Sequence, residues 1–115
     1  MRVTTDIFVS ALIRRVFGDG GFAAVVRRGA AEAGAVFIVT RDRLGEAALY
    51  APAAQAAYGE ETPATRRFTA VGENLDQEAL DRRLAREQRF DSDIWVVEIE
   101  PGRTPLAELL EITKP

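Results

Sequence analysis

Apolar residues near the start of the chain recur at helical spacing. Val9, Ile13 and Val16 lie three or four residues apart, and polar residues occupy the opposite side of the pattern. This periodicity predicts an amphipathic helix over residues 5–17. Valine, isoleucine and phenylalanine also favour strands, so a strand over residues 6–17 remains an open alternative.

Three short apolar runs follow, separated by turn-forming residues. They cover residues 22–28, 35–41 and 46–50 and are rich in alanine, valine, isoleucine and phenylalanine. Runs of this length and composition, bounded by turns, are typical of strands. The glycine-bounded segment 29–34 has the character of a hairpin connection, and a second turn lies at 41–45. We therefore predict that the three strands form an antiparallel meander.

The chain changes character at residues 51–65, where alanine, proline, glutamate and threonine dominate. Connections of this length without secondary structure are uncommon in compact domains and are usually mobile or functional, so we expect an exposed, mobile loop here. Beyond it the pattern predicts a strand over 66–71, a helix over 75–89 and a strand over 93–100. A short C-terminal tail is expected from residue 103, in which the helical spacing of Leu106, Leu109 and Leu110 indicates a short docked turn.

The helix over 75–89 has a clear inward stripe. Leu80 and Leu84 lie four residues apart, and Asn74 and Gln77 have the spacing of a capping box. Glutamate and arginine fill much of the remaining surface, which is typical of a solvated face.

The strand over 93–100 is apolar on one side and mixed on the other. Trp95, Val97 and Ile99 alternate with Ile94 and Val96, and we expect Trp95 to be a core residue. These elements predict an α+β fold in a single domain spanning 1–115. Its sheet would have four to five mostly antiparallel strands, with two main helices packed on one face.

The chain of 115 residues contains no cysteine and no histidine. The commonest general base near neutral pH and the commonest metal ligand are both missing. We therefore predict no catalytic residue, metal or cofactor, and a binding protein is expected more than an enzyme. A net charge of −3 argues against nucleic-acid binding. The N-terminal apolar run is far shorter than the ~20 residues that span a membrane, so we expect a cytoplasmic protein.

Three arginines share one face of the helix over 75–89. Arg82, Arg86 and Arg89 recur at helical spacing, and neighbouring guanidinium groups repel one another unless an anion meets them. Acidic residues that are close in sequence could pair with them internally, namely Asp81, Glu87, Asp91 and Asp93. The other interpretation is a site for an anion or an acidic partner, made by Arg82, Arg86 and Arg89.

Two further patterns have ordinary structural explanations. The glycine-rich segment 18–21 has the order helix, glycines, strand and lacks the lysine of a phosphate-binding loop, so it predicts a plain turn. Glu98 and Glu100 alternate along one strand, as carboxylates do in glycosidases. Two alternating glutamates at the end of a strand are, however, the normal polar face of a half-buried sheet, and we favour this structural interpretation over a catalytic one.

Several segments resemble one known family. They are DSDIWVVEIE preceded by LAREQRF, DIFVSALIRRV near the start, and FAAVVRRGAAEAGAVFIV. In these segments the chain is similar to an uncharacterised, mainly alphaproteobacterial family known as a domain of unknown function, number 1491. The resemblance covers most of the chain outside 51–65 and the tail, and it implies a compact single domain with no activity to transfer. The family's glycine turn is often followed by aspartate, whereas Ala30 follows Gly29 here.

Two functional hypotheses follow. The first is a protein-interaction module, able to self-associate through the apolar leucines of the tail; its partner would be another protein or a second copy. The second is a protein that binds a small anionic ligand through Arg82, Arg86 and Arg89.

Overall fold

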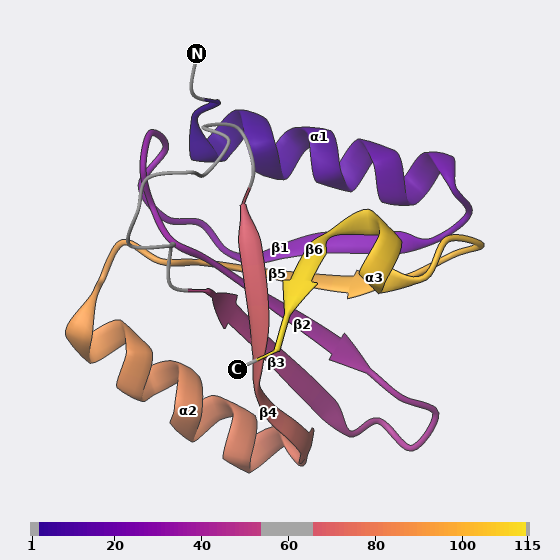
Figure 1. The fold of residues 1–115 in the computed structure, drawn as a ribbon. Coiled ribbons are helices and arrows are strands. Elements are labelled where there is room, and N and C mark those ends of the chain that lie inside the picture. Colours follow the sequence, from indigo (N-terminus) through magenta and orange to yellow (C-terminus); the bar gives the residue numbers. More distant parts are fainter. Residues whose placement is uncertain (1–2, 54–65, 115) are drawn as a thin grey trace.

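The computed structural model describes residues 3–53 and 66–114, which form three helices and a six-stranded sheet (Figure 1). In chain order the elements are α1 Thr5–Gly18, β1 Phe22–Arg27, β2 Val36–Arg41, β3 Ala47–Pro52, β4 Arg67–Leu75, α2 Gln77–Phe90, β5 Trp95–Glu100, α3 Leu106–Leu109 and β6 Glu111–Thr113. The helix predicted over 5–17 is confirmed, and the strand alternative for that segment is wrong.

The sheet is mixed, with the strand order β1-β5-β2-β3-β4-β6. β5 lies parallel to β2 and β6 lies parallel to β4, whereas the other neighbours are antiparallel. The prediction of four to five mostly antiparallel strands is therefore correct in its α+β class and wrong in its sheet. The predicted meander of the first three strands is also wrong, because β5 separates β1 from β2.

β5 occupies an interior position because both of its faces are apolar. Trp95, Val97 and Ile99 are at most 1% exposed on one face, and Ile94 and Val96 are 1% exposed on the other. Strands buried on both faces belong to sheets that helices cover on both sides. α2 supplies the crossover from β4 to β5, as connections between parallel strands require.

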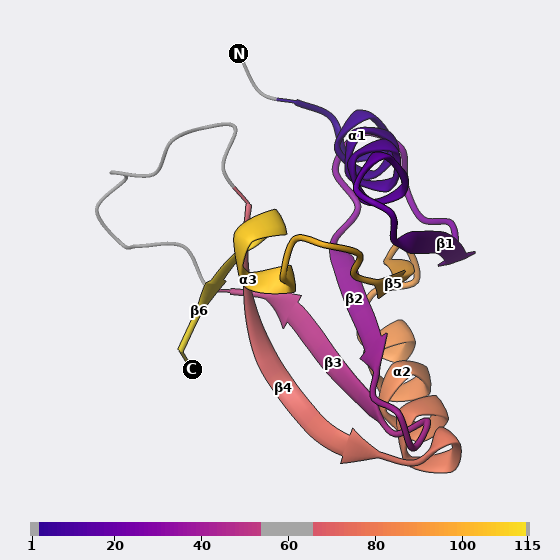
Figure 2. The same cartoon turned by 90° about the vertical axis from the view of Figure 1, so that its right-hand side faces the viewer.

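The helices lie on opposite faces of the sheet. α1 and α3 pack with one cluster of buried residues, and α2 packs with the other (Figure 2). The expectation that both main helices share one face is therefore wrong. A sheet with an apolar interior strand needs cover on each side, and one layer of helices could not provide it.

Segment 29–34 crosses the start of β5 and is not the hairpin connection predicted for it. The backbone N–H of Ala30 donates to the Asp93 carbonyl (3.0 Å), and the indole N–H of Trp95 donates to the Ala30 carbonyl (2.8 Å). A side chain at Gly29 or Gly34 would collide with the same Asp93 oxygen. Glycine at both ends lets the two backbones approach this closely.

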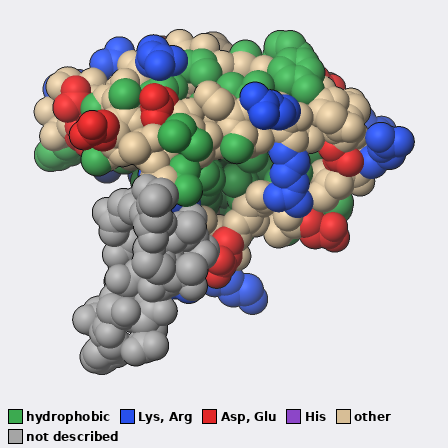
Figure 3. All heavy atoms as spheres, turned by 90° about the horizontal axis from the view of Figure 1, so that it is seen from above, with side chains coloured by type: hydrophobic (Ala, Val, Ile, Leu, Met, Phe, Trp, Pro, Cys, Tyr) green, Lys and Arg blue, Asp and Glu red, His purple; other side chains and the backbone are tan. Residues whose placement is uncertain are grey.

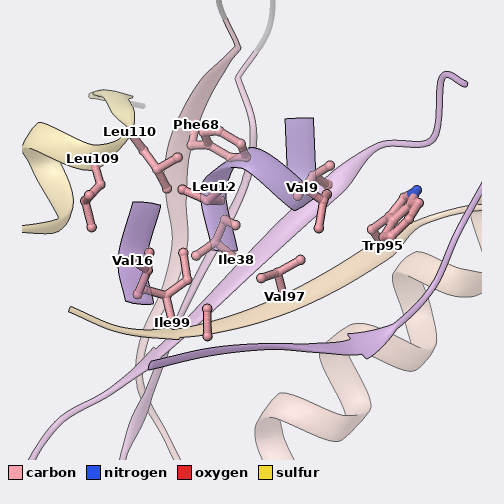
Figure 4. Packing of buried hydrophobic residues seen from close by; sticks show 12 residues of the cluster. Val9, Leu12, Val16, Ile38, Phe68, Trp95, Val97, Ile99, Leu109 and Leu110 are labelled. Carbon is pink, nitrogen blue, oxygen red and sulfur yellow. The ribbon is translucent and has the colours of Figure 1, made fainter. Parts of the chain in front are cut away.

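The larger part of the core lies between α1, α3 and the sheet. Val9, Leu12 and Val16 project from α1 onto Ile38, Val97 and other buried side chains (Figure 4). Trp95 is 1% exposed, which confirms its predicted core position. This face of α1 is the stripe that the sequence pattern identified, and its burial supplies most of the stability that a helix of this length lacks alone.

A second cluster lies between α2 and the sheet. It consists of Phe37, Val39, Ala47, Leu49, Leu80, Ile94 and Val96. α2 begins two residues later than predicted, because the Asp76 carboxylate caps it by accepting from the Ala79 N–H (2.8 Å). The capping role predicted for Asn74 is wrong, since Asn74 ends β4 with a positive φ of 55°.

The predicted loop over 51–65 begins later than expected, and the short turn predicted in the C-terminal tail is confirmed as α3. β3 extends to Pro52, into the predicted 51–65 loop, and the remainder of that prediction, residues 54–65, lies outside the described residues. The segment from 103 forms α3 and β6, and β6 adds to the sheet beside β4. Leu109 and Leu110 are 7% and 6% exposed, so these tail leucines belong to the core and are not available for self-association.

No helix in the described part of the chain is both long enough and apolar enough to cross a membrane.

Candidate functional site

α2 presents a basic face to the solvent. Leu80 is its one fully buried residue, and Leu84 is half-buried on the same side. Arg82, Arg86 and Arg89 are all exposed on the opposite side, and we call these three residues the arginine face. α2 lies at the edge of the molecule, away from α1 and α3, so this face points outward (Figure 1).

The arginines of α2 differ in their partners. Arg83 is held on the inner side, where it pairs with Glu87 (3.1 Å) and donates to the Val71 carbonyl (3.0 Å). Arg82 pairs with Glu78 (3.3 Å), one turn earlier. Among the described residues, Arg86 and Arg89 have neither a hydrogen bond nor an ion pair. Internal pairing therefore accounts for only one of the three residues of the arginine face.

The surface around the arginine face is open. The arginines border a shallow depression that is also lined by Ala79, Arg83 and Ala85. A second shallow groove runs along the neighbouring side of α2, between this helix and β1, lined by Val26, Arg27, Asp81, Leu84, Ala85, Gln88 and Val96. Ala85 lines both, so a basic surface and a partly apolar groove adjoin one another.

The carboxylates of the described residues do not form a catalytic or metal-binding constellation. Glu98 is paired with Arg41 (3.1 Å) and Glu100 is exposed, in agreement with the structural explanation of these two residues. No group of three or more acidic residues that could hold a metal ion is found in residues 3–53 and 66–114.

Two aspartates with altered acidity lie at the ends of α1. The Thr4 hydroxyl donates to the Asp6 carboxylate (2.6 Å) and lowers the pKa of Asp6. Asp19 follows α1 in the glycine-rich segment 18–21, which forms a turn. The backbone N–H of Thr104 donates to the Asp19 carboxylate and lowers its pKa. Both groups fix the ends of α1 and have no part in the arginine face.

Comparison with known proteins identifies the family. Residues 3–107 match the family described as "Protein of unknown function (DUF1491)". The chain belongs to the DUF1491 family. The resemblance noted in the sequence is confirmed.

Solved structures of other family members share the fold. A protein from A. tumefaciens, determined in solution, is 45% identical with a TM-score of 0.82, and the match covers 100% of this chain and 98% of that one. A DUF1491 family protein from Caulobacter crescentus, determined in a crystal, is 38% identical with a TM-score of 0.73, over 98% of this chain and 99% of that one. No curated protein matches the chain. The DUF1491 comparisons thus establish fold and family and assign no residue a role.

The structure places the sequence-predicted residues together but does not close a pocket around them. Arg82, Arg86 and Arg89 share one face, as the helical spacing required. Sequence reasoning missed the adjoining groove, because Val26 and Val96 come together only through the pairing of β1 with β5. The one available signal was the adjacent pair Val25-Val26, since two successive valines in a strand cannot both face the core.

Proposed function

We propose that this DUF1491 protein is a cytoplasmic protein-interaction module whose arginine face binds an acidic segment of a partner protein. The observation that carries the proposal is that Arg86 and Arg89 are exposed and unpaired among the described residues, while Arg82 and Arg83 on the same helix have carboxylate partners. Two solvated guanidinium groups one turn apart repel each other weakly, and a partner's carboxylates would remove that repulsion.

Arginine suits this purpose better than lysine would. Its planar guanidinium group binds a carboxylate through two parallel hydrogen bonds, which fixes the partner's orientation as well as its charge. Exposed charges of this kind mainly speed association and select the partner, and they contribute less to the final affinity. The adjoining groove with Val26 and Leu84 offers apolar area to the same partner. An acidic segment with a few apolar side chains fits both surfaces.

The test compares two charge-reversal variants in cells of the source organism. The variant Arg86→Glu/Arg89→Glu removes the free arginines. The control Arg14→Glu/Arg43→Glu reverses two exposed arginines, one on α1 and one in the β2–β3 turn, which have neither a hydrogen bond nor an ion pair among the described residues. Proteins that copurify with the wild type and with the control, but not with the α2 variant, are expected. Identical sets of captured proteins for all three chains would refute the proposal.

The small anionic ligand remains a second candidate, because four arginine side chains border one depression. The openness of that depression favours a macromolecule, since small-ligand pockets usually enclose most of the ligand's surface. Thermal unfolding with inorganic phosphate and with di- and tricarboxylates separates the two hypotheses. A ligand at 100 times its dissociation constant adds about 2.7 kcal/mol of stability. A stabilisation of that size that Arg86→Ala/Arg89→Ala abolishes would favour the small ligand.

A further inference from the structure

β1 is an edge strand of the sheet. It pairs with β5 on one side, and none of the described residues forms a strand on its other side. Its side chains are unusually apolar for an edge: Phe22, Val25 and Val26 are 52%, 38% and 60% exposed. Natural sheets normally protect such an edge with charges, proline, a bulge or a covering segment. In β1 this protection is confined to the C-terminal end, where the register shifts between Val25 and Arg27 and the strand ends on a charge, whereas residues 22–25 contain neither charge nor proline.

We propose that β1 joins two copies of this chain by antiparallel pairing about a two-fold axis at Ala24. In this register Phe22 lies opposite Val26 of the second copy and Ala23 lies opposite its Val25. The small side chain of Ala24 meets its own symmetry mate on the axis. Phe22 and Val26 would form a cross-strand aromatic and β-branched pair on each side of the axis, a favourable type of pair in sheets.

The faces of the strand agree with this register. Residues that lie opposite each other in an antiparallel pair point to the same face of the sheet. Ala23 and Val25 pair with Ile99 and Val97, which face α1. Phe22 and Ala24 pair with Glu100 and Glu98, whose register positions belong to the opposite face, and the Phe22 ring also lies edge-on to the Phe17 ring of α1 (5.5 Å between centroids). Val26 lies in the irregular step after Val25 and lines the groove beside α2, so its position is on the same side as the register position of Phe22.

The charges at the two ends of β1 are complementary. Arg27 and Arg28 follow the apolar residues at one end, where Arg27 donates to the Ser92 carbonyl (2.8 Å) and the Arg28 guanidinium lies over the Trp95 ring (4.8 Å), and neither forms an ion pair with a carboxylate among the described residues. Glu100 lies next to Phe22 at the other end, is exposed, and makes no ion pair within the described residues. Antiparallel pairing brings the basic end of each copy beside Glu100 of the other, twice per dimer. This complementarity, together with the matched apolar side chains, favours a second copy as the occupant of the edge over an unrelated strand.

The proposed dimer would present two arginine faces. A two-fold axis perpendicular to a continuous sheet places equivalent faces of both copies on the same side. α2 of each copy would then lie on that side, and the exposed arginine faces would not be buried by the strand pairing. A partner with two acidic segments could engage both at once, which raises its effective affinity without any new contact.

The first measurement is the mass in solution by sedimentation or light scattering, from micromolar to millimolar protein. The wild type is expected to reach twice the 12.6 kDa of one chain. Val26→Lys should remove the dimer, because it places two charges beside Phe22 at the interface. Leu44→Lys is the matched control, since Leu44 is 84% exposed in a distant turn, and it should leave the dimer intact. A wild type that is monomeric throughout, or a dimer that survives Val26→Lys, overturns the proposal.

A disulfide test covers the case in which Val26→Lys does not fold. The chain has no cysteine, so a single introduced thiol reports one contact. Opposed residues in antiparallel strands have Cα atoms about 4.5–5.5 Å apart, within the about 4.4–6.8 Å that a disulfide spans. Ala24→Cys should form a covalent dimer on mild oxidation, and Leu44→Cys should not. Equal crosslinking of both variants would also overturn the proposal.

The two proposals fail separately. Arg86→Glu/Arg89→Glu should leave the mass in solution unchanged while it loses the acidic partner. Phe22→Lys, which changes the proposed dimer interface and is not part of the groove lining, should be a monomer that still binds that partner.

Discussion

α1 and α2 have the same length, 14 residues each, but they meet the sheet in different ways. α1 buries Thr5, Val9, Leu12 and Val16, whereas α2 fully buries only Leu80. α1 also reaches the surface with apolar side chains such as Ile7 and Phe17, and in the view from above the hydrophobic side chains lie among basic and acidic ones (Figure 3).

The two helices therefore differ in what holds them to the sheet and in what they present to the solvent. A helix of this length is marginal by itself, so packing of its apolar face must hold it. α1 obtains that packing along its whole length. α2 has fewer buried apolar residues, a capping carboxylate and one salt bridge on its inner side, and its outer side carries exposed arginines. The first helix is held by its buried face, and the second leaves Arg86 and Arg89 exposed and without partners among the described residues.

The largest expected effect is on the core side of α1. Leu12→Ala should lower the free energy of unfolding by about 2–5 kcal/mol, because it leaves a cavity where Leu12 is 5% exposed. Urea unfolding followed by circular dichroism measures this loss. Ser10→Ala, on the exposed side of the same helix, is the control and should change little. Equal losses of stability for the two variants would contradict the assignment of Leu12 to the buried side of α1 and of Ser10 to its exposed side.

The next effect is at the start of α2. Asp76→Ala should cost about 1 kcal/mol of stability, because the N–H of Ala79 loses its capping carboxylate. Asp76→Asn retains an acceptor and should restore most of that stability. The measurement is the same urea titration. If Asp76→Ala leaves the free energy of unfolding unchanged, packing at Leu80 alone holds α2.

A smaller effect is expected at the start of α1 in acid. The pKa of Asp6 is lowered in the folded protein from its ordinary value of 3.8, chiefly by the Thr4 hydroxyl. Its stabilising contribution is therefore complete above that ordinary value and is lost as the pH falls through the lowered, folded pKa. Thr4→Val should raise the pKa of Asp6 in an NMR titration. The pKa of Asp19, which depends on Thr104, should not move and serves as the internal control.

The smallest effect is expected on the arginine face. Arg86→Ala/Arg89→Ala should change the free energy of unfolding by no more than about 0.5 kcal/mol, as exposed substitutions away from structural contacts do. Thermal and urea unfolding check this value. A loss as large as that of Asp76→Ala would mean that these arginines stabilise the fold, and it would weaken their proposed role in binding.

Most of the secondary structure could be predicted from local pattern, and the order of the strands could not. The segments predicted over 22–28, 35–41 and 46–50 correspond to β1, β2 and β3, because each is a short apolar run between turn residues. Their pairing depends on β5, which lies far along the chain. The continuous apolar run Ile94–Val97 was a usable signal, since strands apolar on both faces tend to be interior.

For the candidate site, too, local pattern predicted the position of the residues and not their contacts. Helical spacing was sufficient to place Arg82, Arg86 and Arg89 on one face. It could not show which of them had partners, because Asp91 and Asp93 lie beyond the end of α2, where the chain turns toward β5. β6 escaped prediction because three residues carry too little periodicity to identify a strand.

The position of β5 between β1 and β2 has a consequence for how the protein is made. β5, which lies between β1 and β2, is synthesised after both of them and after α2. The sheet therefore cannot be completed until most of the chain is available. Folds dominated by contacts between distant residues form slowly. A nascent chain that has not reached Trp95 would expose the apolar edges of β1 and β2 together. This exposure ends only when β5 has left the ribosome and paired with both strands.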